Sequence, residues 1–214
     1  MRYLLLALTL TVSVATTVYA EPTTEAVYGE GQVYEADVAD RHLQYTTHQQ
    51  QGDDLVLTSG AIVTSDAFVI FGAQPADRTF APGQYPVVLT LTRDNEGDLR
   101  VAYARVEFGQ GQPVRWEPAS TFSAESGIGA FLDADAVSHA TDDYDPYGKL
   151  VLGAVALAVQ RDEYWSAVLV DPDSGADAVV FTTGYGEGTF TTYWGFDEND
   201  TPVALVADFN VLAP

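Results

Sequence analysis

The sequence predicts an α+β fold, mainly antiparallel β with one or two helices, in a single domain. β-branched and aromatic residues run in short blocks that end at Gly, Asp, Asn or Pro, which is typical of strands joined by turns. Only two segments show apolar residues at helical spacing. The sequence contains no internal repeat and no linker long enough to separate two domains.

Short segments separated by turn residues are expected to be strands. They are 55–57, 61–63, 67–71, 85–92, 99–108, 167–170, 178–181, 189–196 and 203–211. The polar segment 93–98 has the composition of a hairpin turn. Within 99–108, Arg105 and Glu107 alternate with Ala104 and Val106. This alternation predicts a strand with one buried face and one wetter face.

Two segments are expected to be helical. The first is 131–140, where Asp133 or Asp135 is placed to cap the start. The second is 147–161, which ends in the polar residues 160–162. The apolar residues of this second segment recur at helical spacing, at Leu150, Val151, Ala154, Val155 and Ala158.

The N-terminus has the order of a secretory signal peptide over residues 1–20. Arg2 precedes an apolar run, and Ala20 closes a segment of small residues before Glu21. The alternative is an uncleaved anchor, but the Thr-rich second half is weakly hydrophobic for a membrane span. We therefore expect cleavage after Ala20, export to the periplasm or extracellular space, and no stable membrane insertion. Residues 21–31 are expected to be a flexible lead-in to one globular domain, 32–214.

Charge and cysteine content narrow the functional classes. The chain has 9 Lys and Arg against 31 Asp and Glu, a net charge of −22. Such a field repels nucleic acid and anionic lipid surfaces, so a nucleic-acid partner is not expected. Without cysteine, a packed core rather than disulfides must stabilise an exported chain. The acidic, lysine-poor composition fits a saline habitat or simple solubility, and a stability that rises towards molar salt would favour the first.

Five motifs, in the same order along the chain, give the sequence a family resemblance. They are 80–87, 100–108, 113–117, 184–188 with 193–199, and 202–209. From Asp54 to the C-terminus the chain resembles the bacterial domain of unknown function 4241 family. The resemblance implies a compact single domain and no known reaction. Two departures are Gly186-Glu187-Gly188, where the family pattern has Gly-Asp-Gly, and the signal peptide, because family members are usually not exported.

Candidate binding residues cluster near the C-terminus. Gly186 and Gly188 lie in a glycine-dense loop that suits either close approach of a ligand or a tight connection between strands, and the tight connection is favoured. The pair Tyr193 and Trp194 suits either an aromatic platform for a sugar or peptide, or the core. Arg100, Arg105 and Arg115 are each expected to pair with a carboxylate such as Glu107 or Glu117.

Candidate metal and catalytic residues are acidic. Asp171, Asp173 and Asp177 alternate around a glycine as in a calcium loop, but position twelve is Thr182, so a turn is favoured. None of the three histidines has the spacing of a zinc site, and no cofactor is expected.

The sequence lacks a Gly-x-Ser-x-Gly elbow and a cysteine nucleophile. A two-carboxylate mechanism would draw on Glu187, Asp197 and Asp208, which lie near strand ends.

The sequence therefore predicts an exported binding or interaction module without catalysis, whose partner is a protein or a small extracellular ligand. Two alternatives stay open. One is a secreted hydrolase, glycosidase-like, that uses a pair of carboxylates. The other is a calcium-stabilised envelope protein.

Overall fold

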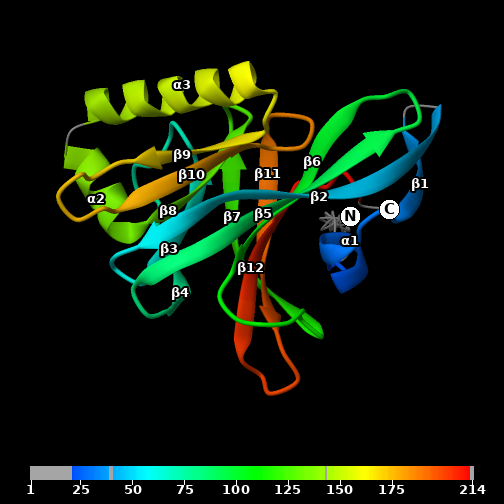
Figure 1. Cartoon of the computed structure of the whole chain (residues 1–214), viewed down its shortest axis with the longest axis horizontal. Coiled ribbons are helices and arrows are strands. Elements are labelled where there is room, and N and C mark those ends of the chain that lie inside the picture. Colours follow the sequence, from blue (N-terminus) through cyan, green and yellow to red (C-terminus); the bar gives the residue numbers. More distant parts are fainter. Residues whose placement is uncertain (1–20, 39–40, 143, 213–214) are drawn as a thin grey trace, which may run out of the picture.

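The computed structural model of the chain describes residues 21–38, 41–142 and 144–212. The predicted signal peptide lies outside these residues. Two antiparallel sheets and three helices form one β-rich domain, which confirms the predicted fold class (Figure 1). Within the described residues, no helix combines the length and the hydropathy needed to span a bilayer.

The larger sheet has seven strands and the smaller sheet has five. In spatial order, the seven-stranded sheet consists of β1 (Val33–Val38), β2 (Arg41–Leu57), β5 (Gly83–Asp94), β6 (Leu99–Glu107), β12 (Pro202–Asp208), β11 (Gly188–Phe196) and β7 (Arg115–Ala124). The five-stranded sheet consists of β4 (Pro75–Thr79), β3 (Ala61–Asp66), β8 (Ile128–Asp133), β10 (Asp177–Thr182) and β9 (Trp165–Leu169). The helices are α1 (Thr24–Tyr28), α2 (Ala134–Asp142) and α3 (Tyr144–Arg161).

The five-stranded sheet lies between two apolar cores. Phe131 of β8 and Phe181 of β10 belong to the core shared with the seven-stranded sheet. Their neighbours Leu132 and Val180 belong to a second core that includes residues of α2 and α3. Because side chains alternate between the faces of a strand, β8 and β10 are buried on both sides and their sequences are almost continuously apolar.

Double burial explains why one predicted boundary is wrong. The segment 131–140, expected to be helical, begins with the end of β8, and α2 starts only at Ala134. A short apolar run in a buried strand cannot be distinguished from a buried helix by periodicity. The predicted cap is correct, because the Asp133 carboxylate accepts a hydrogen bond from the Asp135 amide at 2.7 Å. The second expected helix is α3, which begins three residues earlier than predicted.

The expected strand 67–71 is instead a bend that leaves the sheet. The Asp66 carboxylate accepts from the Phe68 amide at 2.7 Å, and the Ser65 hydroxyl donates to the Val69 carbonyl at 2.8 Å. These side-chain bonds satisfy backbone groups locally and so replace strand pairing. The apolar residues that predicted a strand are consequently exposed at Val69 and Phe71.

The N-terminal segment 21–31, expected to be loose, packs on the seven-stranded sheet through α1. The Val27 carbonyl accepts from Arg105 Nη1 at 3.0 Å and from the Thr90 hydroxyl at 2.6 Å. The Arg105 guanidinium lies 4.1 Å from the centroid of the Tyr28 ring. The face of β6 that was expected to be wetter is therefore covered, and Arg105 is only 5% exposed.

Candidate functional site

A groove of about 410 Å³ runs between β7 and the segment that follows β3. We call it the β7 groove. One wall is the edge of β7 and the other is the segment 64–75, which contains the bend and the start of β4. Its lining residues are Thr64, Ser65, Val69, Phe71, Gly72, Ala73, Gln74, Pro75, Ser120, Thr121, Phe122 and Ser123.

β7 offers an open strand edge to this groove. Among the strands that the structure describes, it is the last of its sheet and pairs with β11 alone (Figure 1). The Ser120 amide donates to the Thr192 hydroxyl at 3.1 Å, so Ser120 faces β11. Successive residues of a strand direct their N–H and C=O groups to opposite sides. Thr121 and Ser123, which line the groove, therefore present their backbone groups to the open edge.

The opposite wall is held in place by a buried carboxylate. Asp66 accepts hydrogen bonds from the Ser126 amide at 2.8 Å and the Ser126 hydroxyl at 2.9 Å, in addition to the Phe68 amide. Asp66 is buried, and these bonds fix the bend relative to the start of β8. The bend carries Phe71, which is 55% exposed. The groove thus has a rigid wall with an exposed aromatic ring.

The chemistry of the groove is neutral in a very acidic chain. Its lining residues are hydroxyl-bearing, amide or apolar, and none is charged. Beyond Ser123 a second hollow, of about 310 Å³, is lined by Glu125 and Glu187. The two hollows share Ser123, so carboxylates stand at one end of a neutral groove. This arrangement suits an extended, mostly uncharged ligand with a cationic group at one end.

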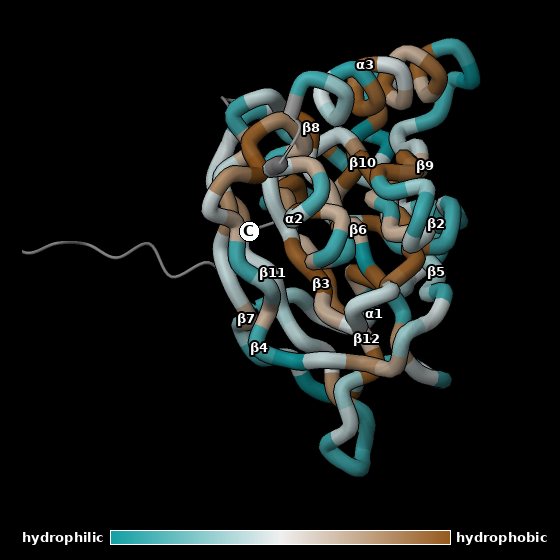
Figure 2. Tube along the Cα trace, turned by 90° about the vertical axis from the view of Figure 1, so that its left-hand side faces the viewer, coloured by the Kyte–Doolittle hydropathy of each residue, from teal (hydrophilic) through white to brown (hydrophobic). Residues whose placement is uncertain are grey.

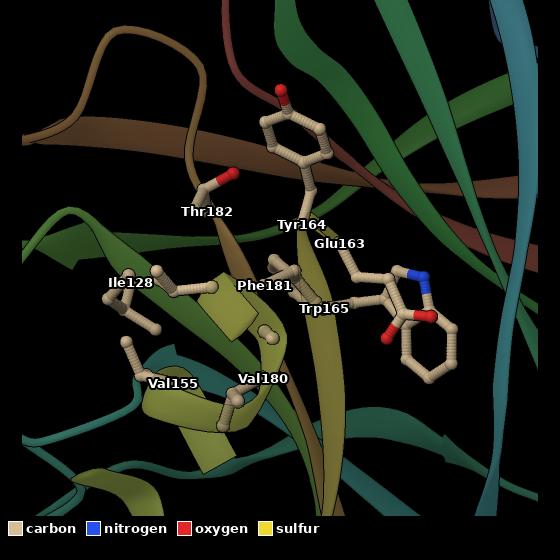
Figure 3. Close-up of a pocket in the computed structure, with 10 residues that line it drawn as sticks. Ile128, Val155, Glu163, Tyr164, Trp165, Val180, Phe181 and Thr182 are labelled. Atoms are coloured by element: carbon tan, nitrogen blue, oxygen red, sulfur yellow. The ribbon is translucent and has the colours of Figure 1, made fainter. Parts of the chain in front are cut away.

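A smaller apolar cavity between α3, β8, β9 and β10 is a packing gap (Figure 3). Figure 3 shows Ile128, Val155 and Val180 around one space. The cavity measures about 40 Å³, which is close to the volume of one water molecule. It has no room for a substrate or cofactor.

The glycine-dense loop before β11 is a tight connection. Gly184 has φ +49° and Gly186 has φ +111°, both in the region that favours glycine. The Gly186 amide donates to the Thr183 carbonyl at 2.7 Å. A Cβ at Gly184 would lie about 3 Å from Phe209 and Val211, and one at Gly188 would lie 2.7 Å from the Phe190 ring. Gly184 and Gly188 therefore serve close packing of the chain on itself, whereas Gly186 has a backbone conformation that favours glycine.

The aromatic pair is part of the core. Tyr193 is buried and Trp194 is 1% exposed. The Trp194 Nε1 group donates to Asp77 Oδ1 at 2.8 Å, so its polar atom is satisfied inside the protein. The pair does not form the exposed platform that the sequence allowed. Tyr193 and Trp194 point to opposite faces of β11, and both faces are covered by neighbouring strands and loops.

The three candidate catalytic carboxylates lie in different settings. Asp197 lies in the β11–β12 turn and accepts from the amides of Asn199 and Thr201 at 2.8 and 2.9 Å, bonds that lower its pKa. Asp208 lies at the other end of the hairpin, where burial raises its pKa to about 6. Glu187 is exposed at the end of the β7 groove. The hairpin separates Asp197 from Asp208, so these two do not flank one cleft as paired catalysis requires.

The candidate calcium residues also separate. Asp171 closes a turn by accepting from the Asp173 amide at 2.9 Å and the Ser174 hydroxyl at 2.6 Å. Asp177 is buried in β10 and accepts from the Val56 amide of β2 at 2.8 Å. Within the described ranges, no group of three or more His, Cys, Asp or Glu residues is placed to hold a metal. The turn interpretation fits this geometry.

The predicted arginine pairs are confirmed. Arg105 donates to Glu107 at 3.0 Å, and Arg115 pairs with Glu117. Arg100 pairs with Asp98 at 2.7 Å. In a chain so poor in cations, these pairs leave the three arginines engaged with carboxylates of the same chain.

Buried Asp177 makes stability depend on pH. Burial raises its pKa to about 7, and the nearby carboxylate of Asp133 adds to the effect. The folded state therefore holds this proton more tightly than the unfolded state, whose aspartate pKa is near 3.9. The stability that this bound proton contributes is fully present below the unfolded pKa. It is lost as the pH rises through the folded pKa of about 7. We expect Asp177→Asn to stabilise the protein at about pH 8 and to change stability less at about pH 5.

Urea unfolding of both proteins at the two pH values measures this difference. The asparagine oxygen can still accept from the Val56 amide, so the hydrogen bond is kept. A variant that is equally destabilised at both pH values would show that the carboxylate is not titrating in this range.

The fold and the groove together define a β-rich domain with a neutral groove beside an open strand edge. A family model described as a protein of unknown function (DUF4241) matches residues 55–207. The chain therefore belongs to the DUF4241 family, as its motifs indicated. No curated protein and no solved structure matches the chain. The matched region includes both walls of the β7 groove, whereas α1 lies before it.

The β7 groove is absent from the sequence predictions because its parts are far apart in the chain. Segment 64–75 and residues 120–123 meet only through the packing of the two sheets. The strand β7 is rich in Ser and Thr and has no block of apolar residues, so the sequence pattern does not predict a strand there. The one usable signal was Phe71, a large apolar residue directly before Gly72.

Proposed function

We propose that this protein is an exported binding module that holds an extended segment of another protein in the β7 groove. The observation that carries the proposal is the open edge of β7 within the groove. Extended peptides bind such edges by adding a strand, with backbone hydrogen bonds for affinity and side-chain contacts for selectivity. Thr121 and Ser123 supply the backbone groups, and Phe71 on the opposite wall supplies an apolar contact.

The charges at the groove indicate which segment fits. The neutral lining favours small, uncharged residues along the middle of the bound segment. Glu125 and Glu187 favour a Lys or Arg at the end beyond Ser123. The overall charge of −22 favours a basic partner more generally and speeds its encounter at low salt.

Export is part of the proposal and rests on the N-terminal sequence. Residues 1–20 have the order of a signal peptide, and a domain without cysteine needs no oxidative folding after export. N-terminal sequencing of protein recovered outside the cytoplasm should begin at Glu21. Recovery of the chain only inside the cell, with Met1 intact, would contradict export.

Proline scanning of β7 tests the binding mode. The probe is a peptide of about ten residues, selected for binding from a random library. We expect Thr121→Pro to lower the affinity for this peptide by tenfold or more, because proline removes the outward N–H. Thr121→Ala keeps that N–H and is the matched control, which we expect to bind within about threefold of wild type. Fluorescence anisotropy of the labelled peptide measures both affinities.

Two further measurements separate a strand-addition mode from other contacts. Hydrogen exchange at the Thr121 and Ser123 amides should slow when the peptide binds. Replacing both Glu125 and Glu187 by glutamine should lower the affinity for peptides that end in Lys or Arg and leave the affinity for neutral peptides unchanged. Equal loss of affinity in Thr121→Ala and Thr121→Pro would overturn backbone pairing and assign the contact to the hydroxyl.

A further inference from the structure

α3 presents a largely apolar face to solvent, on which Lys149 is the one charged residue. Its inner face, with Tyr147, Val151 and Ala154, packs into the second core. On the outer side, Leu152 is 60% exposed and Val159 is 74% exposed. Figure 1 shows α3 lying along the outside of the five-stranded sheet, and Figure 2 shows brown, hydrophobic stretches of α3 at the edge of the molecule. Contiguous exposed apolar surface of this kind marks an interaction site.

The charge distribution indicates a second copy of the chain as the occupant. No charged residue occurs from Leu150 to Gln160, although the chain carries 31 acidic residues. Over the rest of the surface, two copies that each carry a net charge of −22 repel one another. On the α3 face they can approach without like charges in contact. An anionic membrane would be repelled by the rest of the protein, which disfavours it as the occupant.

The pattern of residues on this face is self-complementary. At 3.6 residues per turn, Lys149, Gly153, Ala156 and Gln160 form the centre line of the outer face. Small residues at this line permit close approach of a second helix, and a Cβ added at Gly153 meets nothing within 4 Å. The larger exposed residues form two flanks, Leu152 with Val159 and Leu150 with Leu157.

We propose that two copies associate through antiparallel packing of α3 against α3 of the second copy. The two-fold axis of this dimer is perpendicular to the helices and lies level with the midpoint between positions 154 and 155. Gly153 then lies level with Ala156 of the second copy, and each flank interleaves with its own counterpart, as an isologous interface requires. Lys149, the only lysine, comes level with Gln160 of the second copy. The packing therefore joins apolar flanks along a centre line that carries no carboxylate.

Sedimentation velocity of the wild-type protein and two variants tests the proposal. We expect the wild type to sediment at twice the monomer mass at concentrations of about 100 µM, more completely at high salt because screening relieves the repulsion. Gly153→Glu should raise the dimer dissociation constant at least tenfold. This substitution improves helix propensity, so the monomer should melt no lower than wild type. Ser138→Glu adds the same charge at an exposed position of α2 and should leave the dimer unchanged.

Cross-linking tests the orientation, because a chain without cysteine allows clean single-cysteine variants. Lys149→Cys and Gln160→Cys proteins, when mixed, should be joined by a short bismaleimide. Either variant alone should be joined poorly, since its two thiols lie about 16 Å apart along the helices. A monomeric wild type at both salt concentrations, or a dimer that Gly153→Glu leaves intact, would overturn the proposal. Binding of the monomer to phosphatidylcholine vesicles through this face would do so as well.

Discussion

Arg105→Leu is expected to lower the free energy of unfolding by about 3 to 5 kcal/mol, because it removes a buried guanidinium together with its three hydrogen bonds, one of them to the Glu107 carboxylate. The guanidinium donates to the Val27 carbonyl at 3.0 Å, to Gln49 Oε1 at 2.6 Å and to Glu107 Oε1 at 3.0 Å. Leucine fills part of the volume but satisfies none of these oxygens. Urea unfolding, followed by tryptophan fluorescence, measures the loss.

The same substitution should release α1 from the sheet. Arg105 lies beneath the helix, with its guanidinium against the Tyr28 ring. Limited proteolysis of the folded variant should cut within residues 21–31 at least tenfold faster than in wild type, because local opening exposes the backbone. Arg41→Ala removes an exposed pair with Glu96 and is the control, with an expected loss below about 1 kcal/mol. Similar losses in both variants would contradict a special role for Arg105.

Most of the strand framework could be predicted from the sequence where apolar blocks meet turn residues. The hairpin of β5 and β6 and the C-terminal hairpin of β11 and β12 follow this rule. β7 and most of β2 could not be predicted, because polar residues interrupt their apolar residues and leave no apolar block. Such polar strands are stabilised by pairing with neighbours distant in the chain, and no local pattern reports that pairing.

The site was harder to predict than the fold. Glu187 was singled out as an acid near a strand end, and the structure places it at the end of the β7 groove. The sequence allows Trp194 either a surface platform or the core, and its indole N–H is satisfied by Asp77, more than a hundred residues away, within the core. Which aromatic residue is exposed depends on tertiary contacts, and so Phe71 rather than Trp194 reaches the solvent.

The turn from β2 to β3 shows how tightly the two sheets constrain the backbone. Gly60 has φ +73°, and its carbonyl accepts from the Phe80 amide at 2.8 Å. Asp133 holds the same turn by accepting from the amides of Thr58 and Ser59. The turn is thereby fixed from two sides, by the end of β4 and by the end of β8. A side chain at Gly60 has no direction in which to move.

Gly60→Ala is accordingly expected to cost about 2 to 5 kcal/mol of stability. A left-handed conformation costs alanine about 1 to 2 kcal/mol, and displacing a packed backbone costs a further 1 to 3 kcal/mol, roughly. The added Cβ would lie 2.2 Å from the Phe80 carbonyl oxygen, a backbone atom that cannot rotate away. Gly111→Ala is the matched control, since Gly111 has φ +93° but an added Cβ there meets nothing within 4 Å. Urea unfolding of the two variants separates the conformational cost from the steric cost, and equal losses would show that the backbone at Phe80 yields.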